Sequence, residues 1–165
     1  MVKRALHLLV LAAIVTIGTA SASAQTLTFE ATLSGGEETP APGLNTGAWG
    51  IAEVGVDVTN REISVNLQVF NLPTGTAAGH IHAGSKGTPG PVILDFTMPA
   101  GRTGDFTINF RLGQAAFRAR PEIGIHALED AIQAIVGGNS YVNVHTTQYP
   151  GGEIRGQLTR KAPTQ

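Results

Sequence analysis

The sequence predicts an all-β fold, an antiparallel Greek-key β-sandwich or barrel of about eight strands with one short helix. Two observations support this prediction. Apolar and polar residues alternate strictly along several segments, which is the pattern of half-buried antiparallel strands. The 21 glycines and 9 prolines fit the turns and bulges that must join such strands.

The first three strands follow from this alternation. In residues 26–33 the odd positions are leucine, phenylalanine and alanine, whereas the even positions are threonine and glutamate. Residues 49–58 present a face of glycine, alanine and valine, and residues 62–69 alternate aliphatic with polar side chains. The segment 34–47 between the first two strands is polar and rich in proline and glycine, so we expect a long loop there.

Five further segments complete the predicted sheet. Residues 79–83 and 140–146 are short strands that carry histidines, and residues 92–97 follow the first of them after a turn. Residues 106–112 and 153–158 alternate apolar with polar side chains. Each segment is bounded by Gly, Pro or Asn, as expected of antiparallel strands.

One segment has a helical period instead. Its apolar residues are Leu128, Ala131, Ile132, Ile135 and Val136. The pair Gly137-Gly138 follows as a C-terminal stop. We expect an amphipathic helix over about residues 127–136 that covers an open end of the sheet.

The N-terminus has the features of a secretory signal peptide. Lys3 and Arg4 begin it, an apolar run follows, and Ala22-Ser23-Ala24 resembles a cleavage site. The apolar run is too short for a comfortable membrane span. We therefore expect residues 1–24 to be removed, residues 25–165 to form one domain without a membrane span, and the protein to be exported to the periplasm or the extracellular space.

The composition excludes several functions. The 11 basic and 12 acidic side chains give a formal net charge of −1, and the basic residues are scattered, so nucleic acid is not an expected partner. The sequence has no cysteine. This excludes thiol nucleophiles, zinc ribbons and blue-copper thiolates, while a domain of this size can fold on its hydrophobic core alone.

Three histidines are the main candidate site. His80 and His82 alternate with Ile81, and His145 alternates with Val142 and Val144. Because successive side chains of a strand point to opposite faces, His80 and His82 share one face. If the two strands lie together with their aliphatic sides in one core, all three imidazoles converge on the outer surface.

This convergence predicts a metal site. Three imidazoles are a recurrent ligand set for zinc and for copper. Copper(II) stands above zinc in the Irving–Williams order, so we expect copper, with zinc as the alternative. Calcium and magnesium need oxygen ligands, and acidic residues are lacking nearby. Met98 is the only methionine after residue 24, which excludes a thioether-rich copper(I) site.

Other residues could support the site. Tyr141 and Asn143 share the predicted face of His145, and a hairpin brings Glu153 or Arg155 beside it. Glu153 could accept the far N–H of an imidazole; alternatively, Glu153 and Arg155 form an ordinary surface charge pair.

His126 is a fourth candidate ligand, since it could reach the site from a loop. Nothing in its spacing ties it to the strands, so we expect an ordinary surface histidine.

Signatures of catalysis are lacking: there is no GxSxG or HExxH motif, and Asp95 and Asp105 have no evident partner. The segment Gly84-Ser85-Lys86-Gly87 is superficially similar to a phosphate loop, but no convincing helix follows it, so we expect a turn.

The two histidine segments resemble a known family. HIHAG followed by GPV (residues 80–92), and YVNVHT followed by PGGEIRGQL (residues 141–158), are similar to the CHRD domain, the module named after chordin and also found as stand-alone secreted bacterial proteins. The likeness extends over about residues 26–160. It implies an extracellular β-sandwich, and the three strand histidines fall on its motifs, whereas His126 does not.

A looser similarity links the HxH pair to the strand histidines of Cu/Zn superoxide dismutase. That enzyme's bridging histidine, zinc ligands and disulfide have no match here, so the similarity favours a copper-type site and not dismutase activity. We therefore expect a secreted protein that binds a single metal ion through His80, His82 and His145, in extracytoplasmic metal handling. The alternative is a metal-free extracellular structural or protein-interaction module. An enzyme is less expected.

Overall fold

The structure is a computed structural model that describes residues 26–162. The predicted signal peptide, residues 1–24, lies outside the described residues. The strands are β1 (Thr26–Ser34), β2 (Trp49–Asp57), β3 (Glu62–Leu72), β4 (Thr76–Ala83), β5 (Val92–Phe96), β6 (Gly104–Leu112), β7 (Ser140–Thr146), β8 (Ile154–Gln157) and β9 (Thr159–Arg160). The helices are α1 (Leu128–Val136) and three single 3₁₀ turns, η1 (Gly35–Glu37), η2 (Gln114–Ala116) and η3 (Pro121–Ile123).

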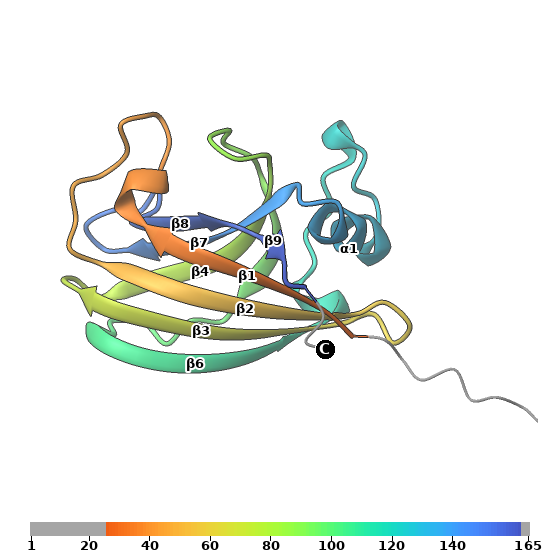
Figure 1. Cartoon of the computed structure of the whole chain (residues 1–165), viewed down its shortest axis with the longest axis horizontal. Helices are drawn as coiled ribbons and strands as arrows, with labels where there is room; N and C mark the ends of the chain where they lie inside the picture. The colour runs from red at the N-terminus through yellow and green to blue at the C-terminus, as the bar shows by residue number, and fades with distance from the viewer. Residues whose placement is uncertain (1–25, 163–165) are drawn as a thin grey trace, which may run out of the picture.

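All nine strands belong to one antiparallel sheet. Its order is β5-β4-β7-β8-β1-β2-β3-β6, with β9 added to β1, and the sheet curls into a nearly closed barrel (Figure 1). The predicted all-β fold with one α-helix is confirmed for the described part of the chain. The extra strand β9 has only two residues, too few to produce an alternating pattern.

The core fills the inside of the barrel. The inward residues of β1, β2 and β3 are those that alternation predicted, for example Leu33, Val54 and Leu67, each fully buried. At one end of the barrel, α1 packs its apolar face onto this core (Figure 1). The predicted helix therefore has the expected position as well as the expected period.

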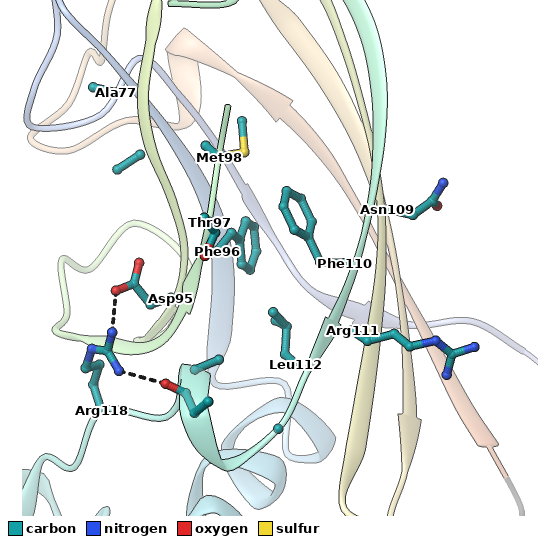
Figure 2. A pocket seen from close by; sticks show the side chains of 14 residues that line it. Ala77, Asp95, Phe96, Thr97, Met98, Asn109, Phe110, Arg111, Leu112 and Arg118 are labelled. Carbon is teal, nitrogen blue, oxygen red and sulfur yellow. Dashed lines mark hydrogen bonds and ion pairs between the residues drawn. The ribbon is translucent and has the colours of Figure 1, made fainter. Parts of the chain in front are cut away.

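The barrel has a seam where β5 and β6, the two ends of the strand order, meet. Phe96 of β5 stacks on Phe110 of β6, with ring centroids 5.0 Å apart (Figure 2). Phe117, which follows β6, makes an antiparallel bridge to Leu94. No continuous backbone ladder joins β5 to β6. The barrel is instead closed there by side-chain stacking and by one β-bridge.

The strand β7 is buried on both faces. Val142 and Val144 point into the core, and Tyr141, Asn143 and His145 point outward. The prediction that these outward side chains lie at the molecular surface is wrong. Loops 34–48, 84–91 and 147–153 cover them, as shown by hydrogen bonds from all three loops to this face.

The contact between β8 and β1 gives a test of the fold. An ideal Cβ on Gly156 would lie 2.5 Å from the backbone oxygen of Thr32, so we expect Gly156→Ala to lower the free energy of unfolding by about 1–3 kcal/mol through overpacking. Gly47→Ala is the matched control, because a Cβ there meets nothing within 4 Å. Urea denaturation measures both. Equal stability of the two variants would contradict the close approach of β8 to β1.

Candidate metal centre

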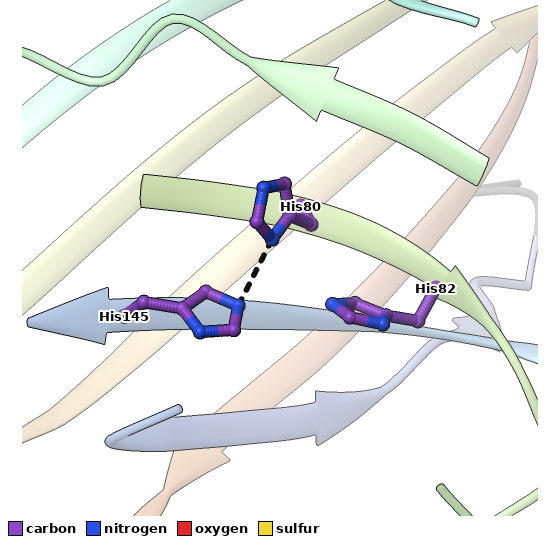
Figure 3. Close-up of side chains that lie close together, drawn as sticks. All are labelled: His80, His82 and His145. Atoms are coloured by element: carbon purple, nitrogen blue, oxygen red, sulfur yellow. Dashed lines mark hydrogen bonds between the residues drawn. The ribbon is translucent and has the colours of Figure 1, made fainter. Parts of the chain in front are cut away.

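The register between β4 and β7 brings the three histidines together. His80 pairs with Asn143, and His82 pairs with Tyr141. His145 lies two residues beyond Asn143, on the same outward face, so it is the diagonal neighbour of His80. One nitrogen from each imidazole lies within 4.8 Å of the others (Figure 3). The predicted convergence of the histidines is confirmed.

The cluster is compact and mostly shielded from water. His80 Nδ1 lies 2.9 Å from His145 Nε2, and the ring centroids of His82 and His145 are 5.9 Å apart. His82 and His145 are each 8% exposed, whereas His80 is half-buried. The cluster is therefore largely buried beneath the loops, and the surface position predicted for it is wrong.

Each imidazole is held by an acceptor on its far side. His82 Nδ1 lies 2.9 Å from the Gly90 carbonyl oxygen, and His145 Nδ1 lies 2.9 Å from the Pro150 carbonyl oxygen. A carbonyl oxygen can only accept, so both Nδ1 atoms carry a proton. His80 Nε2 lies 3.3 Å from Asp95 Oδ1, and a carboxylate likewise only accepts.

The nitrogens that face one another inside the cluster therefore carry lone pairs rather than protons. In a neutral imidazole one nitrogen donates and the other accepts, so His80 Nδ1, His82 Nε2 and His145 Nε2 are all acceptors. His82 Nε2 is buried without a hydrogen-bond partner. Two lone pairs facing each other at 2.9 Å repel unless a cation, a proton or a metal ion, lies between them. Metal-binding histidines typically have this arrangement, with the far N–H donated to a carbonyl or carboxylate.

Burial keeps the three imidazoles neutral. It lowers the pKa of His82 from 6.5 to about 4, with the Gly90 hydrogen bond opposing the shift. The pKa of His80 is lowered by burial first and by His145 second, while Asp95 opposes the shift. Burial also lowers the pKa of His145. Near neutral pH the lone pairs are therefore available to a metal ion, because protons do not compete for them.

A comparison with protein families covers nearly all of the described chain. The model of the CHRD domain family matches residues 29–158, a span that contains β4, β7 and all three histidines. The chain belongs to the CHRD family. Comparisons with curated proteins and with solved structures give no match. Within residues 26–162 of this CHRD domain, no helix is long and apolar enough to cross a membrane.

Two of the predicted supporting residues lie beside the CHRD histidines. The Tyr141 ring is stacked on the His82 ring, with centroids 4.8 Å apart, and its hydroxyl bonds to the backbone of Gly90. Asn143, opposite His80, donates to Glu38 over 3.5 Å. His126 lies elsewhere, exposed just before α1, and is not part of the cluster.

Glu153 fits neither of the roles that were left open for it. Its carboxylate is fully buried and accepts from the hydroxyls of Thr46 and Thr146. Because Thr146 and His145 are adjacent in the strand, they face opposite sides, so Glu153 turns away from the imidazoles. Arg155 is also buried and is no surface partner for it. Glu153 instead links the 34–48 loop to β7 through these two hydrogen bonds.

Two carboxyl groups near the cluster were not predicted from the sequence. Asp95 pairs with His80 across the β4–β5 ladder and forms an ion pair with Arg118. Treating 79–83 and 92–97 as a hairpin would have placed Asp95 beside the histidines. Glu38 comes from the covering loop, and burial raises its pKa to about 7, against the opposing charge of Arg155. No periodicity in the loop signals its position.

Asp95 also lines a cavity of ≈ 640 Å³ at the barrel seam. Phe96, Phe110 and Met98 form part of its apolar wall, and the Asp95–Arg118 pair lies on the β5 side (Figure 2). The carboxylate that orients His80 is therefore shared between the histidine cluster and the seam.

The lowered pKa of His82 predicts how the metal-free protein responds to acid. Between pH 6.5 and 4 the unfolded chain binds a proton at His82 that the folded protein does not, so the free energy of unfolding falls as the pH falls, by about 2–3 kcal/mol in all. In His82→Asn, whose amide can still donate to Gly90, this contribution is absent. Urea denaturation of both proteins at pH 7, 5.5 and 4 measures this contribution. It is the difference between the two proteins in how the free energy of unfolding changes with pH. Parallel pH dependences would contradict a buried, neutral His82.

Proposed function

We propose that this CHRD domain binds a single metal ion, copper in preference to zinc, through His80, His82 and His145. One observation supports this above all. Three imidazole lone pairs, each set by a hydrogen bond on the far nitrogen, converge with all distances within 4.8 Å. Leaving such acceptors buried without a donor is unfavourable, and a bound cation removes that penalty.

The donor set favours copper or zinc. Imidazole nitrogen suits both ions, and copper(II) binds a given nitrogen site more tightly. Two nitrogens bound at about 2.0 Å to one ion lie about 2.8 Å apart at a right angle and about 3.3 Å apart at a tetrahedral angle. The 2.9 Å between His80 Nδ1 and His145 Nε2 falls in that interval.

Three protein ligands leave the bound ion with room for a further ligand, which suits the uptake and release of an ion. We infer a role in extracytoplasmic metal handling. Export is supported by the basic, apolar and small-residue pattern of residues 1–24 and by the extracellular type of the CHRD domain.

A metal-free interaction module is the second candidate function. Its support is an exposed apolar patch on β2 and β3. Trp49 is 40% exposed and stacks on Phe70 with centroids 4.2 Å apart, and the neighbouring Ile51 is 38% exposed. Exposed aromatic groups of this kind occur at interaction surfaces. This patch is distinct from the histidine cluster, so the two candidate functions are separable by substitution.

Substitution of single ligands tests the metal proposal. We expect the apo-protein to bind about one equivalent of Cu(II), and His82→Ala or His145→Ala to weaken binding about a hundredfold or more, since even a supporting residue contributes 10–100-fold. His126→Ala is the matched control and should bind like the wild type, because His126 is exposed and outside the cluster. Calorimetric titration with a competing chelator measures all four proteins. Unchanged affinity in His145→Ala would refute the site.

The pH dependence of copper affinity gives a second test of the proposal. With ordinary histidine pKa values near 6.5, affinity would fall from about pH 7 to 5. Because burial lowers all three values, that of His82 to about 4, we expect the fall in affinity to begin at a lower pH than for ordinary histidines and to continue to about pH 4. Chelator competition across this range measures it. Affinity that is flat down to pH 4 would show that histidine is not the ligand.

A further inference from the structure

A stack of three side chains ends on one of the proposed ligands. The Arg155 guanidinium carbon lies 3.5 Å from the centre of the Tyr141 ring. The Tyr141 ring also stacks on the His82 ring, at an interplanar angle of 8° and a centroid distance of 4.8 Å. Arg155 is 2% exposed and Tyr141 is 3% exposed. A buried positive charge therefore lies close to the site, with one aromatic ring between it and His82.

Arg155 does not form an ion pair with a carboxylate in the described part of the chain. Its guanidinium donates to neutral acceptors, namely the Thr39 hydroxyl and the carbonyl oxygens of Ser85 and Thr88. Glu38 is the acidic group whose pKa responds to Arg155, and burial raises that pKa to about 7, so near neutral pH Glu38 only partly offsets the charge of Arg155.

We propose that Arg155, acting through Tyr141, is a positioning residue that raises the affinity of the histidine site for monovalent copper relative to its affinity for divalent copper. This inference rests on the proposed metal-binding function. The stack fixes the plane of His82, while the buried charge repels a doubly charged ion more strongly than a singly charged one. In the shielded interior such repulsion is only weakly screened by salt. The candidate ligands include no carboxylate, and Asp95 beside His80 is paired with Arg118.

The decisive measurement is the ratio of Cu(I) to Cu(II) affinity, obtained from chelator competition and from the reduction potential of the bound copper. We expect Arg155→Gln to lower this ratio about tenfold, which corresponds to a fall of about 59 mV in the potential of a one-electron couple. Arg111→Gln is the matched control. It removes the same charge from an exposed side chain on β6, and the ratio should not change.

Two further variants separate charge from packing. Arg155→Lys keeps the charge and loses the planar group, so the ratio should stay near that of the wild type even if both affinities fall. Tyr141→Leu removes the ring between Arg155 and His82, and we expect both copper affinities to fall because His82 is no longer held in its plane.

An unchanged ratio in Arg155→Gln would overturn the inference. If that variant does not fold, a tenfold fall of the ratio in Arg155→Lys would overturn it instead, because the charge is still present there. A wild-type protein that binds neither copper ion would overturn the proposed function itself, and the inference with it.

Discussion

The site depends on one constraint, that β7 is covered on both sides. Its inward face belongs to the barrel core, and its outward face lies beneath three loops. A polar group buried in this way must find its partners inside the protein. Tyr141, Asn143 and His145 do so by bonding to loop residues, chiefly to Gly90, Glu38 and Pro150. The loops thereby become part of the site, and its geometry is set by contacts that a surface strand would not need.

The glycines and prolines of these loops have a direct role in this arrangement. Two of the three acceptors that orient the imidazoles are backbone carbonyl oxygens, those of Gly90 and Pro150. At Gly90 a Cβ would overlap the carbonyl oxygen of Ala83, so only glycine brings this carbonyl close enough to His82. A backbone acceptor cannot ionise, and it therefore holds the imidazole tautomer over a wide pH range. The glycines and prolines that suggested ordinary turns thus help to orient the imidazoles.

Alternation was enough to predict the strands, the inward residues and the convergence of His80, His82 and His145, because period-two patterns determine which side chains share a face. Alternation could not predict which loops cover the outward face of β7. The 34–48 and 147–153 loops have no period, so the presence of Glu38 and the burial of His145 left no signal. Glu153 was misplaced for a related reason. It precedes β8, where regular alternation no longer applies, and its carboxylate turns to the Thr46 and Thr146 hydroxyls.

The loops above β7 also have a consequence for the rates of ion exchange. An ion bound at the proposed site by His82 and His145, each 8% exposed, would be shielded from other molecules by the covering segments. Arg155 joins two of these segments by bonding to Thr39, Ser85 and Thr88. Release is then limited by a local opening of the protein, and the residence time of the ion can be long even where its affinity is moderate. Under the proposed function, such a domain would retain its ion between encounters and exchange it slowly.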